Sequence, residues 1–227
     1  VNILSACTAP SISCAGAVSA DAATGACSAN VSYSAATATG TTPTITYSHE
    51  SGSSFSVGVT TVTATATNGC GTASCSFTVT VSDNQNPTIT APANVTVNAN
   101  SGACNATGYD LGSATTADNC GVASVTNNDA GTYSVGTHTI TWTVTDVNGN
   151  TATATQTITV VDNQNPNITA PANVTVNANS GACNATGYDL GSATTADNCG
   201  VASVTNNDAG TYSVGTHTIT WTVTDVN

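Results

Sequence analysis

The residues of this sequence best suited to do chemistry are acidic and amide side chains near the boundaries of its repeats. The chain has 12 Asp and Glu residues and no Lys or Arg, so no basic side chain can neutralise a carboxylate. Calcium accepts six to eight oxygen ligands from carboxylates, amides and backbone carbonyls. The candidate ligands form one set at Asp83, Asn84, Asp118, Asn119, Asp146, Asn148 and Asn150, and an equivalent set at Asp162, Asp197, Asp225 and Asn227.

The segments that carry these residues are copies of one another. Residues 83–148 and 162–227 have the same sequence at an offset of 79, except that Thr88 corresponds to Asn167. The first 82 residues are a diverged copy with small insertions and deletions. Self-similarity at a fixed period is the signature of a tandem array. The sequence therefore predicts three modules, at residues 1–82, 83–161 and 162–227.

Alternation of apolar and polar residues predicts β-strands in these modules. In "THTITWTVTD", Ile140, Trp142 and Val144 point to one face and the threonines to the other. The hairpin signal "DVNGN" follows, and then a second alternating run, "TATATQTITVV". We expect these two runs to form the last hairpin of a sandwich. Short strands at this spacing predict an all-β chain of tandem immunoglobulin-like β-sandwich modules arranged end to end.

The third module stops at "TDVN", where the second continues with "GNTATATQTITVV". Its final strand is therefore missing from this sequence. Either the polypeptide continues beyond residue 227, or a neighbouring copy donates a strand to the open edge. We expect continuation.

The acidic residues converge if this fold is correct. In an immunoglobulin-like module with an odd number of strands, the start of the chain, the loop between the second and third strands and the last hairpin turn lie at one end. "DNQNP", "ADNC" and "DVNGN" occupy these places in the second module. Three carboxylates meeting there would repel one another, so we predict calcium at the junction. The alternative stays open that Asp and Asn are simply favoured in turns. The first module has "TNGCG" at its last turn and lacks "ADN", so we expect no ion at its start.

The motifs also resemble a known family, the hyalin repeat (HYR) domain. The resemblance is carried by "PTIT" and "PSISC", by "GAC" before the second strand, and by "ADNC", "YSVGTHTITWTVTD", "DVNGN" and "ASCSFTVTVSD" in this order. It implies an immunoglobulin-like module of secreted and surface-attached proteins, often in long tandem arrays and often associated with adhesion. It implies no enzymatic activity.

Comparison of the modules predicts disulfide partners for most of the nine cysteines. Cys14 and Cys75 of the first module correspond to Ala91 and Ala154 of the second, and the joint loss of both indicates a bonded pair. The second module has only Cys104 and Cys120, which within the module can pair only with each other. Cys183 and Cys199 repeat that arrangement in the third module.

Three cysteines of the first module remain. Cys27 corresponds to Cys104, but its expected "ADNC" partner is absent from this module. Because the start of a module and its last hairpin turn lie at one end, Cys7 is favoured as the partner of Cys70. A competing hypothesis gives the thiolates of Cys7, Cys14, Cys70 and Cys75 to zinc, although the spacing is loose and disulfides suit an oxidising compartment better.

Composition excludes several functions. A net charge of −12 without a basic residue argues against nucleic acid and anionic membranes as partners. No apolar stretch is long enough to cross a bilayer. His138 and His217 hold the same repeat position on the threonine face of a strand, and His49 lies in a predicted turn, so a Ser-His-Asp site is not expected and the chain is predicted not to be an enzyme.

The sequence is best explained as a structural segment of an extracellular repetitive protein, such as an adhesin stalk or a surface filament. Disulfides would limit the extension of each module, and calcium would stiffen the joints. The expected partners are further modules of the same polypeptide or neighbouring copies in a filament. The alternatives are modules that bind a glycan or another surface, and the accessory region of a secreted hydrolase.

Overall fold

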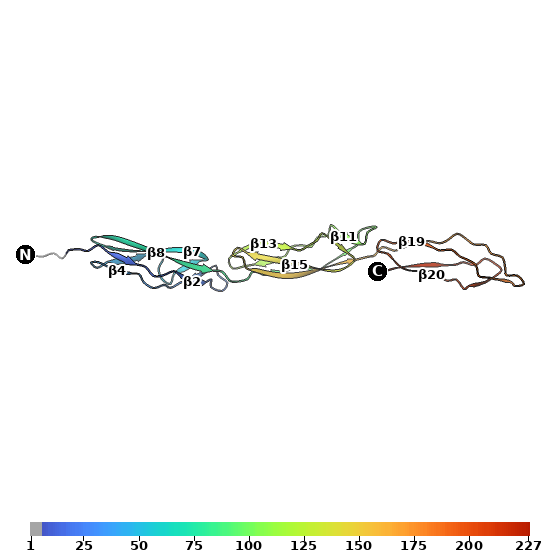
Figure 1. Cartoon of the computed structure of the whole chain (residues 1–227), viewed down its shortest axis with the longest axis horizontal. Helices are drawn as coiled ribbons and strands as arrows, with labels where there is room; N and C mark the ends of the chain where they lie inside the picture. Colours follow the sequence, from blue (N-terminus) through green and yellow to red (C-terminus); the bar gives the residue numbers. More distant parts are fainter. Residues whose placement is uncertain (1–5) are drawn as a thin grey trace, which may run out of the picture. The chain divides into compact units, whose positions relative to one another are not determined.

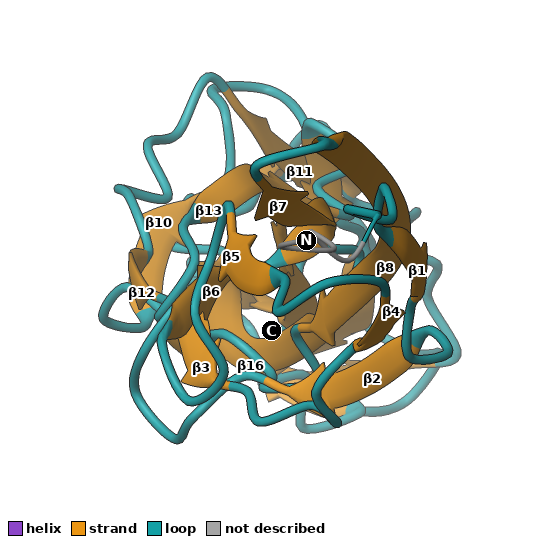
Figure 2. Cartoon of the chain, turned by 90° about the vertical axis from the view of Figure 1, so that its left-hand side faces the viewer, coloured by secondary structure: helices purple, strands orange, loops and turns teal. Residues whose placement is uncertain are grey.

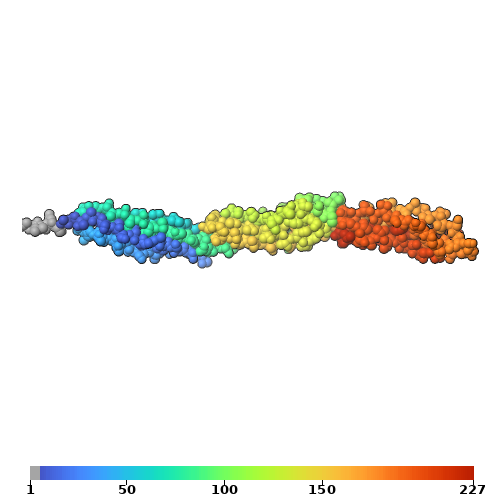
Figure 3. Space-filling model, viewed as in Figure 1, coloured from blue at the N-terminus to red at the C-terminus, as the bar shows by residue number. Residues whose placement is uncertain are grey.

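The computed structural model describes residues 6–227, and these contain β-strands and no helix, as the strand and loop colours of Figure 2 show. The all-β prediction is confirmed. No helix in this part of the chain has the length and apolar character needed to cross a membrane. Figure 3 colours the surface by residue number, and each module has its own part of the colour range, so each module is made of one continuous stretch of chain.

From residue 6 onward, the described part of the first module contains eight strands in three sheets. A four-stranded sheet has the order β2-β8-β7-β5, in which β2 runs parallel to β8 and the other neighbours are antiparallel. The pairs β1-β4 and β3-β6 form the other two sheets. Figure 1 shows β7 and β8 as the long strands of this module. The bounds are β1 Ser11–Ser13, β2 Val18–Asp21, β3 Ser28–Asn30, β4 Thr37–Thr39, β5 Thr44–Tyr47, β6 Ser54–Ser56, β7 Gly58–Asn68 and β8 Gly71–Ser82.

The second module repeats this plan. Its four-stranded sheet has the order β10-β16-β15-β13, with β10 parallel to β16, and its two-stranded sheets are β9-β12 and β11-β14. The bounds are β9 Thr88–Thr90, β10 Val95–Asn98, β11 Asn105–Thr107, β12 Thr115–Ala117, β13 Val122–Asn127, β14 Thr132–Ser134, β15 Gly136–Asp146 and β16 Thr151–Val161. Both modules are immunoglobulin-like sandwiches.

The predicted last hairpin is β15 followed by β16. Ile140 and Val144 are fully buried and Trp142 is 6% exposed, whereas the intervening threonines are not buried, which confirms the predicted faces. Gly149 in the turn has a φ of 97°, a conformation that residues with a Cβ rarely adopt. The same alternation continues in β16, where Ile158 and Val160 are buried.

One buried position in β16 is polar. Gln156 is 0% exposed, and its Nε2 donates hydrogen bonds to the carbonyl oxygens of Ala93 at 2.6 Å and Leu111 at 2.9 Å. These carbonyls belong to no ladder, so the amide supplies them with a hydrogen-bond donor, and the bond to Leu111 is buried. Gln156 thus fastens β16 to two loops of the same module.

The third module has no strand in the place of β16. Its strands are β17 Asn167–Thr169, β18 Asn184–Thr186, β19 Thr194–Ala196, β20 Val201–Asn206, β21 Thr211–Ser213 and β22 Trp221–Asp225, paired as β17-β19, β18-β21 and β20-β22. A groove of about 840 Å³ lies between residues 170–178 and 212–221. Val174 and Val176 beside it are 48% and 47% exposed, whereas their counterparts Val95 and Val97 pair with β16 and are half-buried.

The chain packs as two compact units that do not coincide with the three repeats. The first comprises residues up to Ala91 together with Ser113–Asn127 and Trp142–Ala154. The second comprises Pro92–Gly112, Asn128–Thr141 and Thr155–Asn227. The acidic set around Asp83 therefore lies wholly inside the first unit, and the set around Asp162 lies wholly inside the second.

Candidate metal and disulfide sites at the module junctions

Three carboxylates meet where the first module joins the second. Asp83 follows β8, Asp118 follows β12, and Asp146 is the last residue of β15. One carboxylate oxygen from each lies within 4.8 Å of the others. Asp83 is 6% and Asp146 2% exposed, so this cluster is largely withdrawn from water.

Two of these carboxylates keep one oxygen without a hydrogen bond. Oδ1 of Asp83 accepts bonds from the backbone N–H of Gln85 at 3.1 Å and the side-chain amide of Asn119 at 3.2 Å. Oδ2 of Asp118 accepts two backbone N–H bonds, from Cys120 at 2.8 Å and Gly121 at 2.9 Å. Oδ2 of Asp83 and Oδ1 of Asp118 are buried and have no partner among the described residues. Burying a charged group without a partner is costly, so these two oxygens are the atoms of the cluster that are available to a cation.

The third carboxylate is held ionised by its own turn. Burial by itself would raise the pKa of Asp146, but hydrogen bonds from the side chain and backbone of Asn150 and from the backbone of Asn148 and Gly149 outweigh it and lower the pKa below its usual value. The bonds to Oδ1 from the two asparagine N–H groups are each 2.8 Å. The turn after β15 therefore favours the ionised form of the third carboxylate.

The geometry of the three oxygens fits calcium. Calcium–oxygen distances are about 2.3–2.6 Å, so oxygens on opposite sides of one ion lie about 5 Å apart. Separations of up to 4.8 Å are therefore within its coordination sphere. A divalent cation would also relieve the repulsion of three carboxylates in a chain without Lys or Arg.

The asparagines of the predicted set have other tasks. The amide of Asn84 donates to Oδ1 of Asp21 at 2.7 Å, in the first module, and so binds outside the carboxylate cluster. Asn119 donates to Ala26 O and Asp83, and Asn150 donates to Asp146 at 2.8 Å and to Asp83 O at 3.2 Å. The amides thus support the carboxylates as hydrogen-bond donors.

The junction of the second and third modules repeats the arrangement. Asp162, Asp197 and Asp225 bring one oxygen each within 4.8 Å, and Oδ2 of Asp162 and Oδ1 of Asp197 have no partner among the described residues. Asn198 donates to Asp162 at 3.1 Å and to Ala103 O at 3.0 Å, as Asn119 does in the first junction. The second predicted set is therefore built like the first.

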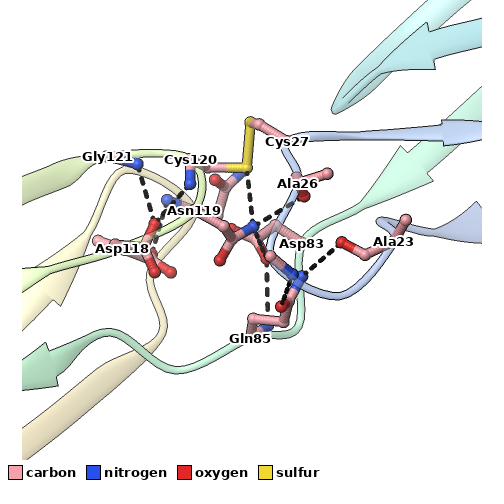
Figure 4. The surroundings of a disulfide bond; sticks show 12 residues. Ala23, Ala26, Cys27, Asp83, Gln85, Asp118, Asn119, Cys120 and Gly121 are labelled. Atoms are coloured by element: carbon pink, nitrogen blue, oxygen red, sulfur yellow. Dashed lines mark hydrogen bonds between the residues drawn. A yellow bond between two sulfur atoms is a disulfide. The ribbon is translucent and has the colours of Figure 1, made fainter.

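The glutamine of each "DNQNP" motif is a junction residue that sequence reasoning missed. Gln85 accepts the backbone N–H of Gly25 at 2.7 Å through Oε1 and donates to Ala23 O at 3.1 Å through Nε2. Gln164 makes the same pair of contacts with Gly102 at 2.7 Å and Asn100 at 3.0 Å. Its recurrence in both linkers was the available signal. Figure 4 shows Gln85 reaching Ala23 beside the disulfide.

Disulfides also cross both junctions, which corrects the predicted pairing of Cys104 with Cys120 and of Cys183 with Cys199. The structure joins Cys27 of the first module to Cys120 of the second, and Cys104 of the second to Cys199 of the third. The Cα–Cα distance is 4.7 Å in each. Figure 4 shows Cys27 and Cys120 bonded next to Asn119.

The physical reason is the length of β16. The backbone N–H of Val147, in the turn before β16, bonds Gly121 O at 3.1 Å, so Cys120 stands near the start of that strand. Ala99 N–H bonds Val161 O at 2.8 Å and Gly102 N–H bonds Gln164, so Cys104 stands near its end. Eleven residues at about 3.3 Å each separate the two cysteines by far more than a disulfide spans.

Within the first module, the structure contains the two expected pairs. Cys14 bonds Cys75 with a Cα–Cα distance of 5.7 Å, and Cys7 bonds Cys70 with 6.0 Å. These four cysteines are thus disulfides in the structure and not the thiolates that the competing zinc hypothesis requires. Cys183 is exposed and, in the described part of the chain, is the cysteine outside a disulfide.

His138 and the nearby Tyr109 contact neighbouring residues of the second module. Nε2 of His138 lies 2.8 Å from Ser134 O, and its ring stacks on Tyr133 with 4.8 Å between centroids. Tyr109 donates to Oδ1 of Asp129 at 2.7 Å. Burial and this bonded carboxylate raise the pKa of Tyr109 well above its usual value. His217 repeats the histidine contacts in the third module.

Three of the solved structures that the chain matches are described by their identity, TM-score and coverage. The titin domains Z1Z2 in complex with telethonin are 15% identical, with a TM-score of 0.30, and the match covers 69% of this chain and 98% of that one. The protocadherin GammaB4 extracellular domain is 14% identical with a TM-score of 0.36, covering 84% and 38%. Dscam1 isoform 9.44 is 12% identical with a TM-score of 0.35, covering 69% and 46%. The chain therefore spans less than half of the last two.

No curated protein sequence matches the chain. The HYR domain family matches it twice, at residues 6–81 and 82–160, which together exceed half of its length. The third module repeats the sequence of the second from Asp162 onward. The chain belongs to the HYR domain family.

Proposed function

We propose that this chain is a structural segment of an extracellular repetitive protein, in which calcium and disulfides together fix each joint between modules. Tandem HYR modules with four disulfides among the described residues fit an extracellular module of the structural or adhesive type. The observation that carries the proposal is the pair of buried, unpartnered carboxylate oxygens at each junction.

Calcium is the ion that this donor set favours. The donors are hard oxygens from carboxylates, and magnesium would demand a tighter octahedral shell at shorter distances. Asp83 directly follows β8, the last strand of the first module, so bound calcium would hold the start of the linker against Asp118 and Asp146 of the second module. Its removal would leave three carboxylates in mutual repulsion and would loosen the joint.

Isothermal titration of the intact, oxidised chain with calcium tests this proposal. We expect two ions per chain, a higher melting temperature with calcium than with a chelator, and little effect of magnesium at the same concentration. Binding of no calcium at millimolar concentration, together with equal melting temperatures in calcium and chelator, would exclude the calcium-stiffened joint.

Charge-matched variants show which carboxylates bind each calcium ion. Asp118→Asn removes a ligand oxygen of the first junction, and Asp197→Asn removes its counterpart in the second, so each should abolish one of the two bound ions. Glu50→Gln removes the same charge from an exposed position in the first module and should leave both ions bound. Loss of calcium in the Glu50 variant would indicate a general effect of net charge.

The partner that we propose is a further module of the same kind. Cys183 holds in the third module the position that Cys27 and Cys104 hold in the first two, and both of those cysteines bond the "ADNC" cysteine of the module that follows. Gly181 and Asn179 correspond to Gly102 and Asn100, whose backbone groups form hydrogen bonds with the side chain of Gln164 at the preceding junction. An Asp-Asn-Cys segment of another module would find the same surroundings there.

A further inference from the structure

The two junction disulfides attach the second module to both of its neighbours. Cys120 is bonded to the preceding module and Cys104 to the following one. These two cysteines are close in sequence, because only the segment 104–120 separates them, whereas the disulfides themselves join residues 93 and 95 positions apart. The second module is thus attached to its neighbours through the two ends of one short segment.

This connectivity creates a short covalent route through the chain. From Cys27, the backbone reaches Cys104 only after passing through the rest of the first module and the start of the second. The alternative route crosses the disulfide to Cys120 and runs backward along the chain to Cys104, which is roughly 16 residues. The Cys104–Cys199 disulfide then continues the route into the third module.

We propose that the junction disulfides form a covalent bypass, which carries tension past the β-sandwich of each module, so that unfolding cannot lengthen the array appreciably. At about 3.5 Å per extended residue, the bypass segment limits the second module to about 56 Å. An uncrosslinked repeat of about 79 residues would release about 280 Å. The inference rests on the proposed structural function and explains how the chain would resist extension even after its sheets have separated.

The folded module already uses much of the available length. Cys120 lies near the start of β16 and Cys104 near its end, and an 11-residue strand spans about 36 Å. The segment between the two cysteines is therefore more than half extended in the native state. Little slack remains to be drawn out when force separates the modules.

The disulfides inside the first module supply a parallel path of nearly equal length, because Cys7–Cys70 leads from the N-terminus to Cys104 through about 40 residues, compared with about 42 through Cys27–Cys120. Cys7–Cys70 and Cys14–Cys75 each join the beginning of the module to its last two strands. Removal of either intramodular bond therefore leaves a path of nearly the same length, whereas removal of Cys104–Cys199 makes the backbone from residue 120 to residue 227 part of the shortest path. This difference supplies a matched control.

Force spectroscopy on the intact chain, held at its two termini, tests the bypass. The oxidised chain should reach a fully stretched length of about 250 Å, set by roughly 70 residues from both termini and the bypass segment, whereas the reduced chain should reach about 790 Å. The double variant Cys104→Ser with Cys199→Ser should reach about 470 Å, because its shortest covalent path crosses Cys27–Cys120 and then follows the backbone from residue 120 to residue 227. The double variant Cys14→Ser with Cys75→Ser, which also lacks one disulfide, should remain at about 250 Å.

Equal stretched lengths for the oxidised and reduced chains, with the disulfides verified by mass spectrometry, would overturn the bypass. The force needed for extension reports separately on the proposed function. If the oxidised chain reaches about 250 Å without any rupture event, with or without calcium, the bypass stands but the rigid structural role fails. The lengths depend only on covalent connectivity, so the result does not require each variant to be fully folded.

Discussion

The side-chain amide of Asn119 in the second module donates a hydrogen bond of 3.0 Å to the backbone carbonyl of Ala26 in the first. The same amide bonds Asp83 at 3.2 Å, and the next residue, Cys120, is bonded to Cys27. One asparagine therefore connects the linker, the disulfide and the carboxylate cluster of a junction. Because this junction lies inside one compact unit, its contacts belong to a single packed region.

Replacement of Asn119 by Ala should weaken this junction locally. The variant removes the side-chain donor from the carbonyl of Ala26 and one of the two donors from Oδ1 of Asp83, which costs about 1–3 kcal/mol. We expect the free energy of local opening to decrease by this amount. Hydrogen exchange at the backbone N–H groups of Cys120 and Gly121 measures it. Asn84→Ala, which removes an exposed contact with Asp21, should change it by about 0.5 kcal/mol or less. Equal effects of the two variants would contradict the role given to Asn119.

Gln156→Leu should destabilise the second module although it makes the core more apolar. The change leaves the carbonyls of Ala93 and Leu111 without the Nε2 donor, at a cost of about 1–3 kcal/mol for each carbonyl that water cannot reach. Thermal melting by circular dichroism measures the effect. Thr151→Val, at an exposed position of the same strand, is the control, and an unchanged melting temperature for Gln156→Leu would refute the prediction.

Tyr188 and Asp208 should make the folding stability of the third module depend on pH at both high and low pH. Burial and the hydrogen bond of 2.6 Å to Asp208 raise the pKa of Tyr188 to about 12, and the same bond lowers the pKa of Asp208. The raised pKa of Tyr188 contributes stability below pH 10 that is lost as the pH rises through about 12. The lowered pKa of Asp208 stabilises the folded third module at pH values above the pKa that this group has in the unfolded chain. That stability is lost as the pH falls through the lower pKa of the folded chain.

Ultraviolet titration of tyrosinate checks this pair. Asp208→Asn should bring the pKa of Tyr188 down toward 10, because the bonded carboxylate no longer opposes ionisation. Glu50→Gln removes a charge elsewhere and should not shift it. A late-titrating Tyr188 in the Asp208 variant would mean that burial alone sets its pKa.

Addition of a copy of residues 149–161 after Asn227 should complete the third module. The added strand would lie in the groove beside Val174 and Val176, and its glutamine would meet the carbonyls of Ala172 and Leu190, which correspond to the two acceptors of Gln156. Trp221, half-buried in the present chain, should become as buried as Trp142, with a blue shift of its fluorescence and a higher melting temperature. A scrambled extension of the same composition should produce neither effect.

Extension by a whole further module should engage Cys183. In the presence of oxidised glutathione, its thiol and the "ADNC" thiol of the added module would lose two electrons and two protons, forming one disulfide while one glutathione disulfide is reduced to two thiols. Peptide mapping should find that pair. Cys183 mapped to the second cysteine of its own module, or left as a free thiol, would contradict the proposed partner.

The strands and the acidic clusters were within reach of sequence reasoning because their signals are local or repeated. Alternation with a period of two placed Ile140 and Val144 in the core, and the shared end of an immunoglobulin-like module brought Asp83 and Asp118 together. The roles of the amides were not predictable in the same way. Asn and Asp have similar turn preferences, so only packing shows that Asn84 turns to Asp21 while Asn119 supports Asp83.

The number of cysteines in each module was not enough to decide which cysteines are bonded. Among the cysteines outside the two pairs of the first module, pairing within modules leaves Cys27 alone, and pairing across junctions leaves Cys183 alone, so each alternative leaves one thiol. The sequence itself determined the tandem array, the long hairpins and the absence of any basic partner for the carboxylates, because these follow from composition and short-range pattern. Only the tertiary structure decided that Cys104 and Cys120 face different neighbours, because a disulfide requires Cα atoms within about 7 Å and the intervening strand holds these two far apart.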